Sequence, residues 1–96
     1  MFLYTFFFEY DGGTYIAQVF APSYDIAPKI WAENFDLHKK RGYKGLFERN
    51  FHKKLTESVI SCEPISIENV SKTWYVSSSH LKRNATIHFT ETSSNV

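Results

Sequence analysis

The sequence predicts an α+β fold, in which an antiparallel sheet of four to five strands, in the order β-β-α-α-β-β, has its helices packed on one face. Three observations lead to this prediction. Two runs of aromatic and β-branched residues near the start are separated by Asp11-Gly12-Gly13, and residues 24–37 and 46–57 show helical spacing of apolar side chains. From Ser58 onward the apolar residues recur with a period of two, which is typical of strands.

Length and composition bound the class of protein. The 96 residues suffice for one domain, which we expect to span residues 1–92 with a frayed tail at 93–96. A hydrophobic content of 43% excludes a disordered chain. A net charge of +1 excludes non-specific electrostatic binding of DNA of the kind that histones show. The single cysteine, Cys62, excludes an intramolecular disulfide and favours the reducing cytoplasm. The apolar opening, residues 1–8, has neither a basic start nor the length of a membrane span, so we expect a strand there and no membrane contact.

The first two strands are expected at Phe2–Tyr10 and Thr14–Phe20, joined by a type I′ turn that uses Asp11-Gly12 or Gly12-Gly13. Either turn pairs even-numbered residues of the first strand with odd-numbered residues of the second. The face expected to cover the core then holds Tyr4, Phe6, Phe8, Tyr15, Ala17 and Val19. The opposite face is mixed and holds Leu3, Thr5, Phe7, Glu9, Thr14, Ile16, Gln18 and Phe20.

Two helices are expected next. The first runs from about residue 24 to 37, with Ser23 or Asp25 as its N-cap and Pro28 tolerated in its first turn. A glycine-containing basic stretch ends it, and a second helix runs to about Glu57. The apolar stripe of this second helix consists of Leu46, Phe47, Phe51 and Leu55.

The carboxy-terminal part is predicted to be sheet, beginning with the alternation of Val59 and Ser61 with Ile60 and Cys62. Pro64 argues against one continuous strand from 58 to 68, so a further short strand is expected. Residues 77–84 are predicted to form a polar hairpin loop between strands around Trp74 and Ile87, and the tail from Glu91 is expected to fray.

Charge is distributed unevenly along this order. Residues 1–37 carry five acidic side chains against Lys29, a net charge of −4, whereas residues 38–57 carry seven basic side chains against two acidic ones, a net charge of +5. This basic segment, between His38 and Lys54, is a candidate contact surface for an acidic protein or for nucleic acid. The alternative is that it is only a solvent-exposed face, as most runs of charged residues are. The candidate contact residues are Lys39, Lys40, Arg41, Tyr43, Lys44, Arg49 and Lys53.

No set of residues has the spacing of a catalytic or metal site, so we expect no cofactor and no metal. Cys62 is interpreted as an inert thiol buried on a strand rather than a nucleophile. The four histidines are interpreted as surface residues, because none has the spacing of a zinc motif; they are His38, His52, His80 and His88. A metal-dependent nuclease would need a cluster of acidic side chains. Most of the available acidic residues are expected at turns and helix caps, where they serve the backbone; they are Asp11, Asp25, Glu33, Asp36, Glu48 and Glu57.

The mixed face of the first hairpin is the remaining feature. Leu3, Phe7, Ile16 and Phe20 would leave an apolar patch exposed on it unless another chain or another element covers them. Self-association through this face or through a sheet edge, giving a homodimer, is therefore one hypothesis.

The opening also resembles known families. An aromatic strand, the acidic–glycine turn Asp11-Gly12, a strand with Tyr15-x-Ala17 and then a helix resemble the start of HicB-type antitoxin domains. The spacing Tyr4-x-Phe6-x-x-x-Tyr10-x-Gly12-Gly13-Thr14-Tyr15-Ile16-x-Gln18-Val19 is also similar to the opening of small bacterial proteins of about one hundred residues, some of which look like immunity proteins. The resemblance covers the first third of the chain. The sequence departs from the HicB-type pattern in having Phe20-Ala21-Pro22-Ser23 in place of a proline-rich turn, and in carrying no appended DNA-binding helices.

The function predicted is that of a small cytoplasmic binding protein without enzymatic activity, which occludes a macromolecular partner as immunity proteins and antitoxins do. An unidentified protein is the expected partner, and nucleic acid is the alternative through residues 38–54. Two other classes stay open: a metal-dependent nuclease, and an oligomeric structural or regulatory protein.

Overall fold

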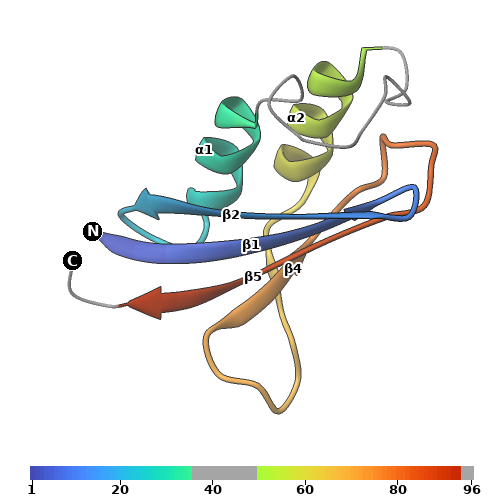
Figure 1. Ribbon diagram of the computed structural model, residues 1–96. Helices are drawn as coiled ribbons and strands as arrows, with labels where there is room; N and C mark the ends of the chain where they lie inside the picture. The colour runs from blue at the N-terminus through green and yellow to red at the C-terminus, as the bar shows by residue number, and fades with distance from the viewer. Residues whose placement is uncertain (36–49, 94–96) are drawn as a thin grey trace.

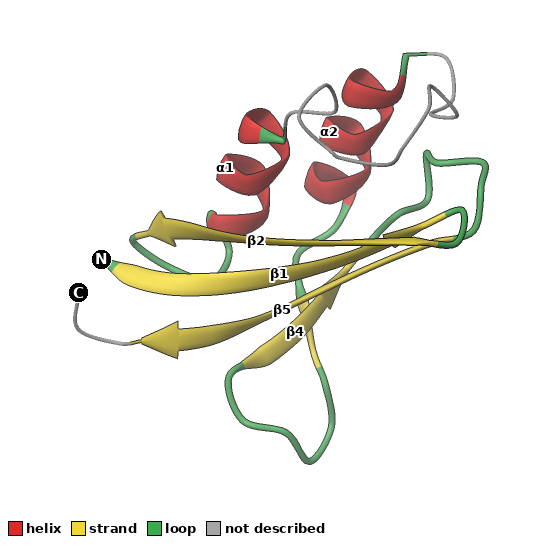
Figure 2. Ribbon diagram, viewed as in Figure 1, coloured by secondary structure: helices red, strands yellow, loops and turns green. Residues whose placement is uncertain are grey.

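A computed structural model describes residues 1–35 and 50–93 of the chain. Their order is β1 (Phe2–Tyr10), β2 (Gly13–Ala21), α1 (Ala27–Asn34), α2 (Phe51–Ser61), β3 (Ile65–Ser66), β4 (Thr73–Val76) and β5 (Ala85–Ser93). The strands form one antiparallel sheet in the order β2-β1-β5-β4-β3. Both helices lie against the same face of this sheet, so the molecule has two layers (Figures 1 and 2). The predicted fold class is confirmed, with the short additional strand present as β3.

The first hairpin forms as predicted. Asp11 and Gly12 occupy the turn with positive φ angles of 50° and 87°, and Tyr10 pairs with Gly13. The pairing then continues without a shift to Phe2 and Ala21. Even-numbered residues of β1 therefore share a face with odd-numbered residues of β2, as the two-residue turn requires.

The core lies between this face and the helices. Phe6 stacks on Trp31 of α1, with a centroid distance of 5.0 Å, and on Phe89 of β5 at 4.5 Å. Phe8 meets Trp31 edge-on at 5.5 Å. All four rings are at most 2% exposed, so aromatic packing accounts for much of the apolar burial.

The first helix is shorter than predicted and is capped differently. It spans Ala27–Asn34, with Pro28 in the first turn, and its N-cap residue is Ile26. Neither Ser23 nor Asp25 caps it with a side chain, because the Ser23 hydroxyl donates to the Asp25 carboxylate. The main-chain carbonyl of Ser23 instead accepts from the amides of Ile26 and Ala27 at 3.3 and 3.2 Å.

The second helix continues further than predicted, so the expectation of a strand from Ser58 was wrong. It runs from Phe51 to Ser61, and the four-residue spacing of Phe51, Leu55 and Val59 carries the buried stripe on by one more turn. Residue Ser58 is fully buried, and its hydroxyl accepts a hydrogen bond from the His80 amide at 2.9 Å. That bond ties the helix to the loop between β4 and β5. The predicted start of the helix, at residues 46–49, lies outside the described residues.

Two further expectations need correction. Cys62 is exposed at the end of α2 rather than buried on a strand, because the helix occupies the positions that were expected to be sheet. β5 continues to Ser93, beyond Glu91, where fraying was expected to begin. Pro64 does separate the preceding residues from β3, as predicted, and residues 77–84 form the loop between β4 and β5. Within residues 1–35 and 50–93, neither helix has the length and apolar character to cross a membrane.

We expect the substitution Leu55→Ala to lower the free energy of unfolding by about 2–5 kcal/mol, because Leu55 is fully buried and its truncation leaves a cavity. Ile60→Ala is the matched control on the same helix: Ile60 is 59% exposed, and its substitution should change stability by less than about 0.5 kcal/mol. Urea unfolding of the two variants measures the difference. Equal losses would contradict the helical register of α2.

Alkaline pH should destabilise the protein through Tyr4. Burial raises the pKa of the Tyr4 hydroxyl above its ordinary value of 10.0, and the carboxylates of Glu91 and Asp25 raise it further. A raised pKa means that the folded state holds the proton more tightly than the unfolded state, so this contribution is complete below about pH 10 and is lost as pH rises through the folded-state pKa. We expect the difference in melting temperature between pH 9 and pH 11 to be smaller in Tyr4→Phe than in the wild type. An equal difference in both proteins would contradict the assignment to Tyr4.

Candidate functional site

The sheet face opposite the helices is the candidate site, and its centre is a cross-sheet band of one residue from each strand. The pairing places Ile16 beside Phe7, Phe7 beside His88, and His88 beside Tyr75. Ile65 pairs with Tyr75 and completes the band at the opposite edge. We call these five residues the cross-sheet band.

The band is open, and it consists of aliphatic and aromatic side chains apart from the His88 imidazole at its centre. Ile16, Tyr75 and Ile65 are 59%, 46% and 50% exposed. Between them, the Phe7 and His88 rings stack with a centroid distance of 5.0 Å and an interplanar angle of 12°, and both are half-buried. The two stacked rings form the middle of the band. At the two ends of the band, Ile16 and Ile65 expose aliphatic side chains to solvent.

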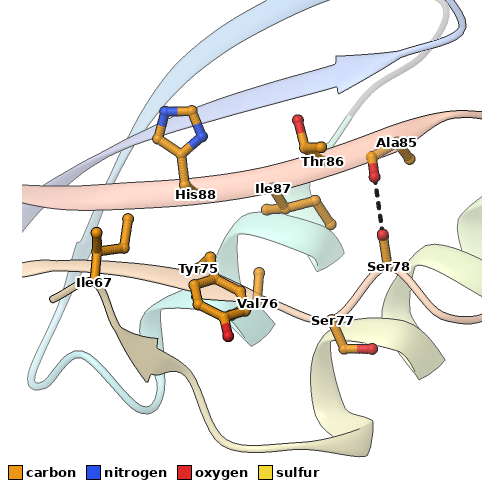
Figure 3. Close-up of a pocket in the computed structure, with 9 residues that line it drawn as sticks. All are labelled: Ile67, Tyr75, Val76, Ser77, Ser78, Ala85, Thr86, Ile87 and His88. Atoms are coloured by element: carbon orange, nitrogen blue, oxygen red, sulfur yellow. Dashed lines mark hydrogen bonds between the residues drawn. The ribbon is translucent and has the colours of Figure 1, made fainter.

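A shallow pocket of about 520 Å³ lies at the β4–β5 side of the band. Tyr75 and His88 of the band line it together with Ile67, and Ser77 and Thr86 supply hydroxyl groups (Figure 3). At its rim the Ser78 hydroxyl donates to the Ala85 carbonyl at 3.0 Å, which fixes the start of the loop between β4 and β5. The pocket therefore offers apolar walls with a few polar groups, the usual composition of a site for a protruding side chain.

A polar row borders the band on one side. The Gln18 amide donates to the Thr5 hydroxyl at 3.0 Å, and Thr5 donates to Thr92 at 3.2 Å. On the same row the hydroxyls of Thr73 and Thr90 are 3.2 Å apart. These side chains form hydrogen bonds with one another, so the row is ordered without a bound partner.

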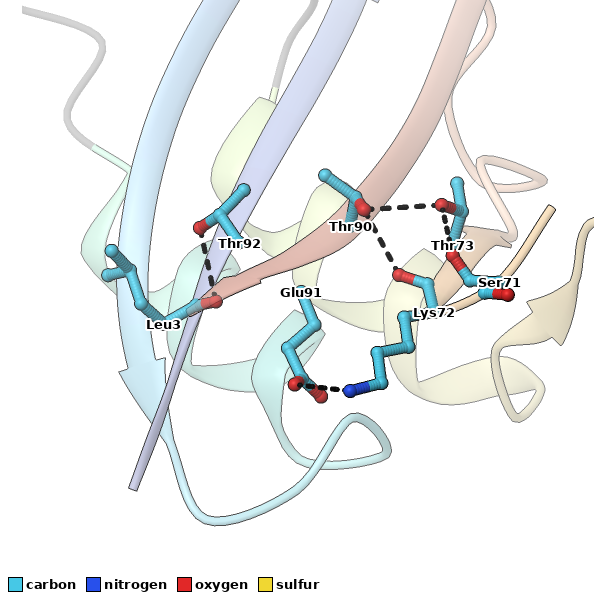
Figure 4. A network of polar contacts seen from close by, with 7 residues as sticks. All are labelled: Leu3, Ser71, Lys72, Thr73, Thr90, Glu91 and Thr92. Atoms are coloured by element: carbon cyan, nitrogen blue, oxygen red, sulfur yellow. Dashed lines mark hydrogen bonds and ion pairs between the residues drawn. The ribbon is translucent and has the colours of Figure 1, made fainter. Parts of the chain in front are cut away.

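The same row is anchored at its ends by the main chain (Figure 4). The Thr92 hydroxyl donates to the Leu3 carbonyl at 3.2 Å, and the Thr90 hydroxyl donates to the Lys72 carbonyl at 3.1 Å. An ion pair between Lys72 and Glu91, with a nitrogen–oxygen distance of 3.4 Å, closes the turn that leads into β4.

A second polar row borders the band on the other side. It consists of Thr14, Glu9 and Thr86, which the strand pairing places next to one another. The Thr86 hydroxyl donates to the Glu9 carboxylate at 3.2 Å. An apolar centre with polar residues on both sides is the general arrangement of a protein–protein interface.

The four residues predicted to form an apolar patch all lie on this face, but in two separate rows. Phe7 and Ile16 belong to the cross-sheet band, whereas Leu3 pairs with Phe20 beyond the Thr5 row. His88, Tyr75 and Ile65 were not expected to contribute to this face. In the sequence His88 and Tyr75 alternate with the apolar residues of their strands, but only the strand order shows that they continue the row of Phe7.

The other candidate surface, the basic segment, is mostly outside the described residues. This applies to Lys39, Lys40, Arg41, Tyr43, Lys44 and Arg49. Lys53 is described, and it is exposed on α2. It therefore belongs to the helix layer, on the other side of the sheet from the cross-sheet band (Figure 1).

The candidate catalytic residues are dispersed. The His52 Nε2 atom lies 3.0 Å from the Ala32 carbonyl and links the two helices, while His80 lies in the loop after β4. Asp11 and Asp25 lie beyond opposite ends of the nine-residue strand β2, and Asp11 forms an ion pair with Arg83 at 2.7 Å. Among the described residues no three histidine, cysteine or acidic side chains are grouped as metal ligands would be. His38, Asp36 and Glu48 lie outside those residues.

Comparison with protein-family models, with curated protein sequences and with solved structures returned no match. The resemblance of the first third to HicB-type domains and to immunity-like proteins therefore stays a prediction. A functional conclusion has to be drawn from the surface of this chain itself.

Proposed function

We propose that this chain is a binding protein that docks on another protein through the face of its sheet that the helices leave uncovered, and that it acts by occluding that partner. One observation carries the proposal: the cross-sheet band crosses the five strands of the described sheet, and a polar row borders it from β2 to β4 on one side and from β2 to β5 on the other. Single exposed apolar residues are ordinary on protein surfaces, whereas a contiguous apolar row with a polar border is typical of an interface.

The chemistry of the face defines the partner. Ile16 and Ile65, at the two ends of the band, suit an apolar surface, and the pocket beside Tyr75 suits an inserted apolar side chain. The hydroxyls of the polar rows suit main-chain or amide groups around that contact. Such a surface favours a folded protein with an apolar ridge over nucleic acid, which requires cations to neutralise its phosphates.

We place this activity in the cytoplasm. The exposed, unpaired thiol of Cys62 supports this, because such a thiol persists in a reducing compartment. Nucleic-acid binding through residues 38–54 is the second candidate. Lys53, the described member of that segment, lies on α2 in the helix layer, so the two candidates can be tested separately.

The face is tested by Tyr75→Lys, with Ile60→Lys as the control. Tyr75 is 46% exposed in the band, and Ile60 is 59% exposed on α2, so each substitution places a charge on a different layer without opening the core. Tagged wild-type protein should capture a stoichiometric protein from the native lysate. We expect Ile60→Lys to retain that protein and Tyr75→Lys to bind it at least about tenfold more weakly by calorimetry, since a lysine there would be desolvated without a partner.

The opposite pattern would overturn the proposal. Equal affinity of Tyr75→Lys and the wild type for the captured protein would show that the band is not the contact surface. The tagged protein could instead recover RNA. If this RNA binding is lost between low and moderate salt and on Lys53→Glu substitution, the result would support the basic segment as the contact surface. Melting temperatures of all variants should be compared first, so that loss of binding is not confused with loss of the fold.

A further inference from the structure

The outer edge of β2 is a second surface of the sheet, distinct from the face just described. β2 is the terminal strand in the order β2-β1-β5-β4-β3, and its inner edge pairs with β1 over its whole length of nine residues. No other strand among the described residues pairs with its outer edge. We infer that a second copy of this chain pairs with this edge, β2 against β2, and forms a continuous ten-stranded sheet around a two-fold axis.

β2 lacks the features by which proteins protect an edge strand. Such strands are usually short, bulged, or interrupted by lysine or proline, because an exposed row of amides and carbonyls pairs readily with another chain. β2 is nine residues long, its pairing with β1 shows no register shift, and residues 13–21 contain no charged residue and no proline. Ile16 and Phe20 on this strand are 59% and 51% exposed.

The other edge of the same sheet is protected. β3 has only two residues, Ile65 and Ser66, and Pro64 precedes it directly. Pairing along β3 is therefore limited to a very short stretch. The contrast between the two edges shows that the open edge of β2 is not a general property of this sheet.

Alternate residues of β2 direct their main-chain amides and carbonyls outward from the sheet. In a two-residue hairpin the residues that flank the turn, here Tyr10 and Gly13, exchange hydrogen bonds, and the pattern then alternates along the ladder. The odd-numbered residues of β2 thus direct their amides and carbonyls toward β1. The even-numbered residues, Thr14, Ile16, Gln18 and Phe20, direct theirs away from the sheet.

The outer edge of β2 is also complementary to itself. Antiparallel pairing about Ala17 opposes Ile16 to Gln18 of the second copy, and Thr14 to Phe20. All four are residues whose main-chain groups point outward, so each pair can exchange hydrogen bonds. On the helix side the same register opposes Tyr15 to Val19, an aromatic and β-branched pair of the kind that stabilises sheets.

Charge does not oppose this assembly. The strand is uncharged, so no like charges meet across the seam, and the whole chain carries only +1. A strand of nine residues is about 30 Å long, which gives a contact smaller than the roughly 800 Å² per partner of a standard interface. We therefore expect a reversible dimer with a dissociation constant on the order of micromolar rather than an obligate one.

Two double variants test both the edge and the register. Ile16→Lys with Gln18→Lys places like charges opposite each other across the two-fold axis and should weaken the dimer. Ile16→Lys with Gln18→Glu places a lysine opposite a glutamate in the same register and should restore the dimer. Both variants alter the same two exposed side chains, so their effects on the fold of one copy are closely matched.

Sedimentation velocity over a concentration series from about 5 to 500 μM gives the mass, with reductant present because the exposed Cys62 can otherwise crosslink two chains. We expect the wild type and the Lys/Glu variant to shift from the 11.2 kDa monomer toward twice that mass, and the Lys/Lys variant to need at least about tenfold higher concentration. A wild type that stays monomeric at the highest concentration would overturn the inference. So would a dimer that persists unchanged in the Lys/Lys variant, since it would use another surface.

The inference and the proposed function share Ile16, but they can fail separately, because the pocket beside Tyr75 lies three strands away from β2. Gln18→Pro provides a second test that acts on the main chain. It removes one outward amide, whereas Gln18→Ala removes the same side chain and keeps the amide. We expect only Gln18→Pro to weaken the dimer, provided that both variants show cooperative thermal unfolding; equal dimerisation of two folded variants would also overturn the inference.

Discussion

The alternation of side chains along β1 is the constraint on which the rest of the structure depends. Its even-numbered residues, such as Phe6 and Phe8, are fully buried against the helices, while its odd-numbered residues, such as Phe7, form the uncovered face. β1 is paired on both sides over most of its length, so its register is transmitted to β2 and β5. A slip of one residue would expose the core and bury the band at the same time.

This dependence explains what the sequence could predict. The two-residue turn at Asp11-Gly12 is a local signal, so the faces of the first hairpin followed from it and were confirmed. The end of α2 was missed because Val59 fits two patterns. It continues the four-residue spacing from Leu55, and it also begins an alternation with Ser61. Val59 packs in the core, and this tertiary packing favours continuation of the helix over the start of a strand.

The candidate site was predictable only in part, for a physical reason. Each strand's alternation is local, and it correctly placed Phe7, Ile16 and His88 on the surface side of their strands. Which strands become neighbours is decided by packing between distant parts of the chain, here β1 with β5. The band of five residues exists only because the strands lie in this order. No single segment of the sequence therefore indicated that Tyr75 and Ile65 would extend it.

The two proposed surfaces meet at Ile16, which is both the end of the cross-sheet band and an edge residue of β2. In the antiparallel register about Ala17, the row that contains Ile16 continues into the row of the second copy that contains Gln18 and Thr5. The bands of two copies are then offset by two residues along the strand, about 7 Å, and do not merge into one. Each copy keeps its own pocket beside Tyr75, three strands from the seam. Pairing through the edge is therefore compatible with one partner bound to the face of each copy, and it would double the number of sites without changing either of them.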